Sequence, residues 1–265
     1  MKMTRISVLM GIYNCCSTLA EALDSLYAQT YQDFKIILCD DGSEDNTYKV
    51  AKEYADKHDN IVLIKNEKNM GLNYTLNHCL EYADTEYCAR MDGDDISLPQ
   101  RFEREIVFLD EHPEYAVVSV PMIYFDENGD YRTERGRGEI KKHDFVHGSP
   151  VCHGPSMVRT AILKAVGGYS VDYKLLRTED YHLWFKLFAS GHKLYMLEEP
   201  LYKMRDYHNN PKRRNWMTRR NEAYVRHIGY KMIGLPWWTQ IYTIVPILKY
   251  LMPDFVYNYF HYRGR

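Results

Sequence analysis

The stretch Arg90-Met91-Asp92-Gly93-Asp94-Asp95 places three carboxylates within four positions after a largely apolar run. That run, Glu86 to Ala89, is typical of a buried strand. Like charges this close raise one another's pKa unless they share a cation. Mg²⁺ and Mn²⁺ favour carboxylate oxygens and keep positions open for water or phosphate. The stretch therefore predicts a metal-phosphate site at a strand end, and a solvated acidic turn is the alternative.

Around this stretch, apolar runs alternate with amphipathic segments. We predict strands at 6–10, 34–39, 61–64 and 86–89. We predict helices that begin at a Thr18–Glu21 capping box, that span 45–58, and that begin within 69–72. Ser97 and Gln100 resemble a further capping box, with Pro99 in the first turn of its helix. This alternation predicts an α/β fold with a Rossmann-like, mostly parallel sheet flanked by helices.

Polar residues follow three of the predicted strands. Tyr13 and Asn14 follow the first strand, Asp40 and Asp41 follow the second, and the acidic stretch 90–95 follows the fourth. Ligands of such sheets bind outside the carboxyl ends of the strands. We therefore expect these residues, which are distant in sequence, to line one rim.

The second half of the chain is less regular. We expect strand-like segments at 115–124 and 156–159, a basic glycine-containing loop at 132–137, and helices at 103–111, at 161–166 and from Thr178 onward. Thr178-Glu179-Asp180 is an ordinary acidic first turn of a helix, and its two carboxylates are also candidates for a catalytic role.

The C-terminal part differs in composition from the rest. Residues 203–231 contain nine Lys or Arg and two acids, whereas residues 232–262 contain only Lys249 and Asp254 as charges and are rich in Trp and Tyr. We predict a first domain over 1–210 and a helical extension over 211–265. A basic stretch before a broken apolar one suits a membrane interface. Helices packed on the domain, or a contact in a homo-oligomer, are the alternatives.

Composition limits the function classes. The chain has 265 residues and a net charge of −2, so no global field attracts nucleic acid. Its six cysteines lack paired metal-ligand spacing, which is typical of buried thiols in a reducing compartment. The first residues lead into a strand without the apolar segment of a secretory signal. We therefore expect a cytoplasmic protein, or one peripheral on the cytoplasmic face of a membrane.

The chain resembles an inverting glycosyltransferase of family two with the GT-A fold, over about Ile6 to Tyr207. Four landmarks in order carry the resemblance: the Gly11-Ile12-Tyr13-Asn14 loop, the Asp40-Asp41-Gly42-Ser43 loop, Asn69-Met70-Gly71-Leu72 with the 90–95 stretch, and Glu179-Asp180 before Leu183-Trp184. Gly11 replaces the proline usual in the family. The resemblance implies hexosyl transfer of the bacterial surface-polysaccharide type, from a nucleotide-diphosphate sugar to a saccharide or lipid-linked saccharide.

The resemblance also implies roles in donor binding. UDP-sugar is the expected co-substrate and Mn²⁺ or Mg²⁺ the expected metal, with Asp94 the first candidate ligand and Asp92 bound to ribose or metal. Asp41 can accept a hydrogen bond from uracil, and Tyr13 offers a ring for stacking. We expect a nucleotide site formed by Gly11, Tyr13, Asn14, Asp41, Asn69, Gly71, Arg90 and Asp92.

For catalysis, the family pattern makes Asp180 the candidate base, with Glu179 the alternative. His153 is a candidate on the acceptor side, although a lone histidine is more often structural. Many relatives carry a histidine at the position that Arg205 occupies, and His208 lies three residues further on. This departure makes a histidine metal ligand doubtful and predicts that Arg205 contacts the diphosphate.

Other functions fit less well. A sugar nucleotidyltransferase needs a glycine-rich, lysine-containing phosphate loop, whereas residues 9–16 contain one glycine and no basic residue. A Rossmann dehydrogenase needs a glycine fingerprint after its first strand, which the chain lacks. A non-catalytic sugar-nucleotide-binding protein, or a membrane scaffold subunit, remains the alternative from another class.

Overall fold

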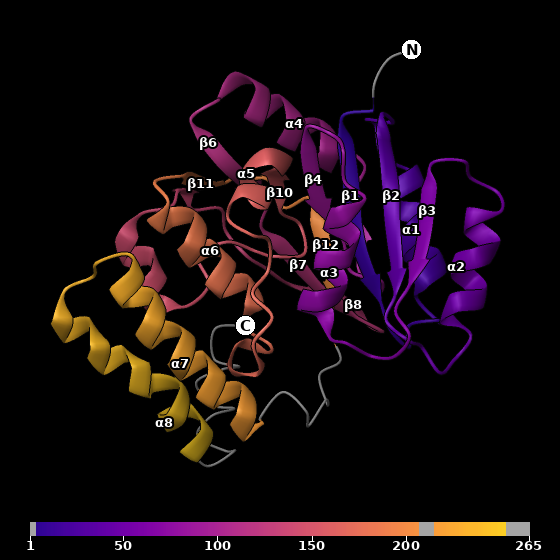
Figure 1. Ribbon diagram of the computed structural model, residues 1–265. Helices are drawn as coiled ribbons and strands as arrows, with labels where there is room; N and C mark the ends of the chain where they lie inside the picture. Colours follow the sequence, from indigo (N-terminus) through magenta and orange to yellow (C-terminus); the bar gives the residue numbers. More distant parts are fainter. Residues whose placement is uncertain (1–3, 207–214, 253–265) are drawn as a thin grey trace.

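The computed structural model describes residues 4–206 and 215–252. Among these, a large sheet has the strand order β3-β2-β1-β4-β10-β6-β11-β9 (Figure 1). The bounds are β1 Ile6–Ile12, β2 Phe34–Asp40, β3 Ile61–Lys65, β4 Tyr87–Arg90, β6 Tyr115–Ser119, β9 Gly138–Glu139, β10 Met157–Arg159 and β11 Lys193–Met196. Strands β1 to β4 are parallel, whereas β10 runs antiparallel to β4 and β6. The prediction of a mostly parallel α/β sheet is confirmed.

Helices cover both faces of this sheet. Their bounds are α1 Leu19–Tyr27, α2 Thr47–Ala55, α3 Leu72–Glu81, α4 Arg101–Glu111, α5 Thr160–Ala165 and α6 Glu179–Ala189. Side chains of β1 alternate between the faces: Val8 and Met10 join the core formed with α1, α2 and α4, whereas Leu9 joins the core formed with α3, α5 and α6. The sheet is therefore buried on both sides.

A smaller sheet continues the chain beyond the acidic stretch. Its order is β5-β12-β7-β8, with bounds β5 Ile96–Ser97, β7 Met122–Asp126, β8 Gly129–Thr133 and β12 Tyr202–Arg205. The acidic loop, which we define as residues 91–95, thus connects β4 in the large sheet to β5 in the small one. The single strand predicted over 115–124 is wrong: β6 ends at Ser119 and β7 begins in the other sheet at Met122. Pro121 lies between them, and proline cannot donate to a strand ladder.

The predicted capping box of the first helix is also wrong. No Thr18 side-chain bond caps α1; its hydroxyl donates instead to the carbonyl of Gly93, at 3.0 Å. Glu21 forms an ion pair with Arg205. Thr18 therefore connects the start of α1 to the acidic loop, and Glu21 connects α1 to β12. These contacts are tertiary, so the spacing of the two residues in the sequence does not predict them.

The second predicted capping box fails for a similar reason. Helix α4 begins at Arg101, and Ser97 belongs to β5. The side chain of Gln29, which follows α1, accepts a hydrogen bond from the backbone N–H of Phe102 at 3.1 Å and donates to the hydroxyl of Ser97 at 3.1 Å. A residue distant in sequence thus supplies a hydrogen-bond acceptor for a backbone N–H in the first turn of α4.

The C-terminal layer consists of α7 Trp216–Met232, the 3₁₀ helix η4 Trp237–Ile244 and α8 Val245–Leu251. Helix α7 packs against α6, and η4 and α8 pack against α7 (Figure 1). No described helix is long and apolar enough to cross a membrane. All six cysteines are free; four are buried, while Cys15 and Cys16 are partly exposed.

Candidate active site

The acidic loop leaves β4 at Arg90, whose guanidinium is buried and forms an ion pair with Asp92. Gly93 permits a close approach to the loop between β1 and α1, since a Cβ there would lie 2.8 Å from the Sγ of Cys15. Asp95 is buried and accepts a hydrogen bond from the backbone N–H of Arg205 at 2.8 Å. The loop is therefore held on both sides, and Asp92 and Asp94 remain partly exposed.

The charge of this loop is not balanced by its own residues. Burial and the nearby charge of Asp92 raise the pKa of Asp94 to about 6. Burial and the charges of Asp92 and Asp94 raise the pKa of Asp95 well above its usual range. A divalent cation would relieve this crowding. No group of three or more His, Cys, Asp or Glu in the described residues is arranged as a metal cage. The partly exposed carboxylates of Asp92 and Asp94 could hold a cation whose other positions take water or phosphate.

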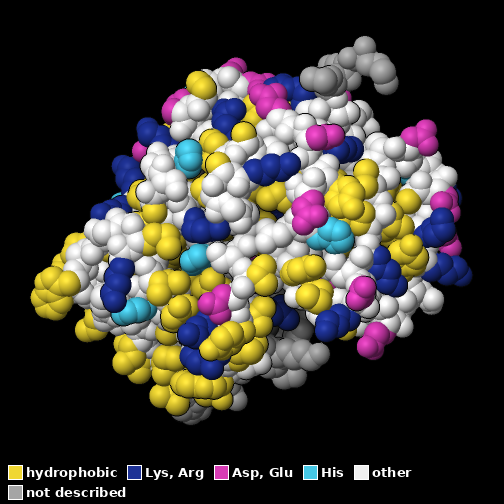
Figure 2. Space-filling model, in the orientation of Figure 1, with side chains coloured by type: hydrophobic (Ala, Val, Ile, Leu, Met, Phe, Trp, Pro, Cys, Tyr) yellow, Lys and Arg dark blue, Asp and Glu magenta, His cyan; other side chains and the backbone are white. Residues whose placement is uncertain are grey.

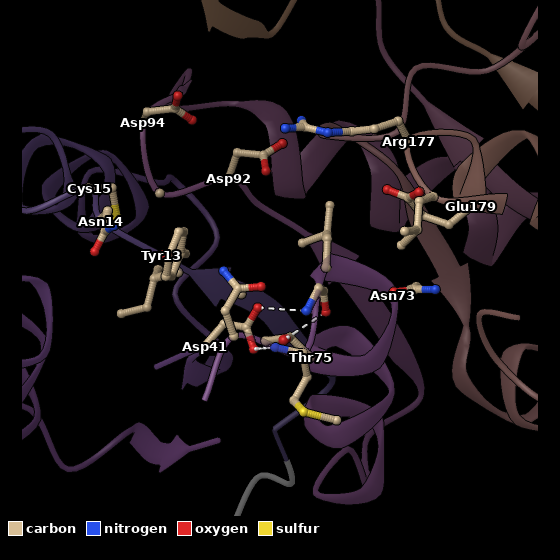
Figure 3. A pocket seen from close by; sticks show the side chains of 18 of the residues that line it. Tyr13, Asn14, Cys15, Asp41, Asn73, Thr75, Asp92, Asp94, Arg177 and Glu179 are labelled. Carbon is tan, nitrogen blue, oxygen red and sulfur yellow. Dashed lines mark hydrogen bonds between the residues drawn. The ribbon is translucent and has the colours of Figure 1, made fainter. Parts of the chain in front are cut away.

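A cavity of about 770 Å³ opens beside the acidic loop, and we call it the donor-side cavity because it contains most residues of the predicted nucleotide site. It is lined from several elements, by Gly11, Tyr13, Asn14, Cys15, Asp41, Asn69, Gly71, Leu72, Asn73, Thr75, Asp92, Asp94, Arg177, Glu179 and Met217, among others. In Figure 3, Asp92 and Asp94 lie across this donor-side cavity from Asp41, and Arg177 points toward Asp92. The structure thus brings Tyr13, Asn14, Asp41, Asp92 and Asp94 together at this cavity. The other side chains expected at the rim are buried and do not line it: Asp40, Arg90, Met91 and Asp95.

Asp41 anchors one wall of the donor-side cavity. Its carboxylate accepts hydrogen bonds from the backbone N–H of Met70 (2.8 Å), from that of Gly71 (2.9 Å) and from the side chain of Asn66 (2.8 Å). Gly71 has φ +89, a conformation that favours glycine. A carboxylate has about four acceptor positions, so three are used and one remains for a ligand. The ring of Tyr13 is 42% exposed at this cavity.

Glu179 and Asp180 begin α6 and diverge from each other. Glu179 lines the donor-side cavity and is only 7% exposed, and its Oε2 has no hydrogen-bond partner within the described chain. Burial and the nearby charge of Asp180 raise the pKa of Glu179 to about 7. The preceding Arg177 has φ +68, which is uncommon for a residue other than glycine. Strain of this kind is often maintained at functional sites.

A second cavity of about 360 Å³ adjoins the first, because Leu72 and Asp92 line both. Its other lining residues include Arg90, Asp95, Met122, Glu134, Arg137, Ser149, Cys152, His153, Asp180, Met196 and Met204. Burial raises the pKa of Asp180, whose carboxylate accepts a hydrogen bond from Ser149 at 3.4 Å. Asp180 therefore faces this second cavity, whereas Glu179 faces the first.

His153 lines the second cavity, where its Nε2 lies 2.8 Å from the hydroxyl of Tyr169. Burial lowers the pKa of His153 well below its usual range, so the imidazole is neutral. It can donate or accept a hydrogen bond there, but it supplies no positive charge.

The structure does not place Arg205 at either cavity. Its guanidinium donates to the backbone carbonyl of Asp94 at 2.9 Å and pairs with Glu21, so it supports the acidic loop from behind. His208 lies outside the described residues. Sequence reasoning did not identify Arg177 or Glu134 as cavity residues. The predicted basic loop contributes Arg137 to the wall of the second cavity, a position that no local sequence pattern predicts.

Comparison with known proteins identifies the family of this chain. The model of the family "Glycosyl transferase family 2" matches residues 7–167. The chain belongs to glycosyl transferase family 2. It is 39% identical to a Bacillus subtilis protein named as the glycosyltransferase EpsE, over 97% of this chain and 93% of that protein. It is 33% identical to the amylovoran biosynthesis glycosyltransferase AmsE of Erwinia amylovora, over 98% of each chain. The predictions of family and of transferase activity are confirmed.

Solved structures agree with the fold. The crystal structure of S. aureus TarS 1–349 in complex with UDP-GlcNAc has a TM-score of 0.71 and 20% identity, over 93% of this family 2 chain and 71% of that one. The mannosyltransferase PcManGT of Pyrobaculum calidifontis, in complex with GDP-Man and Mn²⁺, has a TM-score of 0.64 and 16% identity, over 92% of this chain and 74% of that one. The expected GT-A fold is confirmed.

Proposed function

We propose that this family 2 protein is a metal-dependent, inverting glycosyltransferase that moves a sugar from a UDP-sugar to a hydroxyl of a saccharide acceptor. The observation that carries the proposal is the pair of adjoining cavities, with Glu179 on one and Asp180 on the other. In this proposal the donor binds in the cavity lined by Glu179, and the acceptor binds in the second cavity, lined by Asp180.

The donor side is supported by polar groups placed for a nucleoside diphosphate. Asp41 retains one free acceptor position for the N–H of a uracil, and Tyr13 offers an exposed ring beside it. TarS has been solved with UDP and with UDP-GlcNAc, and PcManGT with GDP-Man. Because two backbone N–H groups fix the Asp41 carboxylate, its remaining acceptor position is preorganised for an N–H donor such as that of uracil.

The raised pKa of Asp94 fits a cation site at the acidic loop. Asp94 and Asp92 would hold Mn²⁺ or Mg²⁺, which when bound offsets charge on the departing diphosphate. Arg90 neutralises Asp92 from beneath and keeps its carboxylate at the junction of the two cavities. Arg177 adds a cationic side chain on the other wall of the donor-side cavity.

In the proposed reaction Asp180 acts as the general base. It removes the proton of the acceptor hydroxyl, whose oxygen forms a bond to the anomeric carbon while the bond to the diphosphate oxygen breaks. A single displacement from the opposite face inverts the configuration. The raised pKa of Asp180 makes its carboxylate a better proton acceptor than an exposed aspartate. Glu179, on the donor side, is placed to contact the sugar being transferred.

We propose a saccharide or lipid-linked saccharide of polysaccharide synthesis as the acceptor. AmsE is named for amylovoran biosynthesis. A protein of Escherichia coli, 26% identical over 72% of this chain and 73% of that protein, is named UDP-Glc:alpha-D-GlcNAc-diphosphoundecaprenol beta-1,3-glucosyltransferase WfaP. A lipid-linked acceptor would place the enzyme on the cytoplasmic face of a membrane, with residues 1–210 as the catalytic domain and 211–265 as its extension.

The rival proposal, a non-catalytic sugar-nucleotide binder or scaffold, is separable by turnover. A pooled screen of nucleotide sugars in Mn²⁺, with mixed saccharide acceptors, should release nucleoside diphosphate from one donor and give a product of inverted configuration by NMR. If the wild type and Asp180→Asn both bind UDP tightly, and neither turns over any pair of donor and acceptor, the protein is a non-catalytic sugar-nucleotide binder.

A further inference from the structure

The C-terminal layer presents large apolar side chains to solvent. Trp237, Ile241, Ile244, Leu248 and Leu251 follow one another at spacings of four, three, four and three residues. We call them the apolar stripe. Each is at least half exposed, and Trp237 is 86% exposed. Figure 2 shows hydrophobic side chains gathered over this end of the molecule. Exposed patches of this kind mark interaction surfaces.

The buried face of these helices is already occupied. Thr239 is 1% exposed and Pro246 is buried, on the side where η4 and α8 pack against α7. These helices therefore expose large apolar side chains and bury Thr239 and Pro246, whereas a helix that packs on a core buries its apolar face. Trp238, 55% exposed, and Tyr242 widen the stripe on one side.

Among the described residues beyond α7, the one charged side chain is basic. Between positions 232 and 252 the sequence contains no Asp or Glu, and Lys249 is exposed beside Leu248. Lys142 is also exposed and donates to the carbonyl of Gly234 at 2.5 Å, before the stripe begins, and Lys231 is exposed at the end of α7. Anionic lipid attracts such lysines, while Trp and Tyr favour the headgroup region.

We propose that the apolar stripe and these lysines form a docking surface for an anionic lipid bilayer. A second copy of the chain is the rival occupant, because heptad-like spacing also suits helix pairing. Three features disfavour a coiled-coil contact between two copies. They are the aromatic side chains flanking the stripe, the proline at position 246 and the absence of alternating charges beside the stripe.

The C-terminal layer also contacts the helix that contributes to the wall of the donor-side cavity. Helix α8 returns alongside α7, so that the rings of Tyr250 and Trp216 lie 5.4 Å apart between centroids. The next residue, Met217, lines the donor-side cavity. Docking through the stripe therefore holds this cavity beside the bilayer. The proposal goes beyond the transfer reaction and does not depend on the identity of either substrate.

Vesicle flotation of the full chain tests the proposal. The chain should float with phosphatidylcholine vesicles that contain phosphatidylglycerol at low salt, and at least about tenfold more weakly with phosphatidylcholine alone or at high salt. Ile241→Ser with Leu248→Ser should abolish flotation. Val107→Ser, at an apolar residue on α4 that is 45% exposed, is the matched control and should float like the wild type.

Calorimetric UDP binding and circular dichroism of each variant show whether the fold and the donor site are intact, so a failed docking surface is distinguishable from a failed enzyme. The proposal is overturned if the wild type stays unbound to anionic vesicles at low salt. It is equally overturned if the chain sediments as a discrete oligomer that Ile241→Ser with Leu248→Ser converts to monomer.

Discussion

Glu179 and Asp180 are adjacent in sequence, yet Glu179 lines the donor-side cavity and Asp180 lines the second cavity. The separation arises because successive residues at the start of a helix project about 100° apart. Burial and the nearby charge of Asp180 raise the pKa of Glu179 to about 7, whereas Asp180 accepts a hydrogen bond from Ser149. The two carboxylates therefore have different environments and, in our proposal, different tasks.

This difference predicts distinct kinetics for two conservative variants. Asp180→Asn should lower kcat by roughly 10² to 10⁴ and leave UDP affinity unchanged, because the proton is transferred only in the transition state. Glu179→Gln should mainly change the KM for the donor or the choice of donor sugar. Steady-state kinetics with both substrates measure these effects. The reverse pattern, with Glu179→Gln inactive and Asp180→Asn active, would exchange their roles.

The raised pKa of Glu179 predicts a pH-dependent stability. An unfolded glutamate has a pKa of about 4.3, so between this value and about 7 the folded state binds more protons than the unfolded state. Stability contributed by Glu179 is therefore lost as pH rises through this window. Glu179→Gln should be more stable than the wild type at pH 8, by up to about 3 kcal/mol, and the difference should vanish near pH 4.

Urea unfolding without donor or metal measures this difference. Glu105, buried beside Arg101 with its pKa raised to about 8, also titrates, but it contributes equally to both proteins and cancels. A stability difference that is the same at every pH would contradict the assignment.

Asp41→Asn should weaken both the fold and donor binding. The variant keeps one oxygen, but its amide group faces N–H donors, such as those of Met70 and Gly71, that have lost an acceptor. We expect a loss of about 1–3 kcal/mol in the free energy of unfolding, together with weaker UDP binding. Asp56→Asn, at an exposed acid paired with Lys52, is the control and should change neither. Unchanged UDP affinity in Asp41→Asn would exclude it from the uracil site.

Arg137 offers a test of the acceptor side. It lines the second cavity, and no carboxylate within the described chain forms an ion pair with it. Arg137→Ala should raise the KM for the acceptor and leave the KM for the donor unchanged. Arg135→Ala, in the same loop but outside both cavities, is the matched control. Equal effects of the two substitutions would mean that the loop acts only through its overall charge.

The sequence was sufficient for the features that depend on local patterns. Strand 6–12 is buried on both faces, its predicted loop carries Tyr13, and strand-end geometry brings that loop to Asp41 and Asp92. Prediction failed where a distant residue replaced a local partner. Gln29 satisfies the start of α4, and Thr18 bonds Gly93 rather than its own helix. Arg205 was expected at the diphosphate, but Glu21, far away in sequence, engages it behind the acidic loop.

In the proposed reaction Asp94 holds a cation that the donor diphosphate shares. Calorimetric titration with UDP, in Mn²⁺ and in EDTA, measures it in the wild type, in Asp94→Asn and in the control Asp56→Asn. We predict that Mn²⁺ tightens UDP binding at least about tenfold in the wild type and in Asp56→Asn, and that Asp94→Asn binds equally weakly with and without metal. Equal Mn²⁺ enhancement in Asp94→Asn and the wild type would contradict the account.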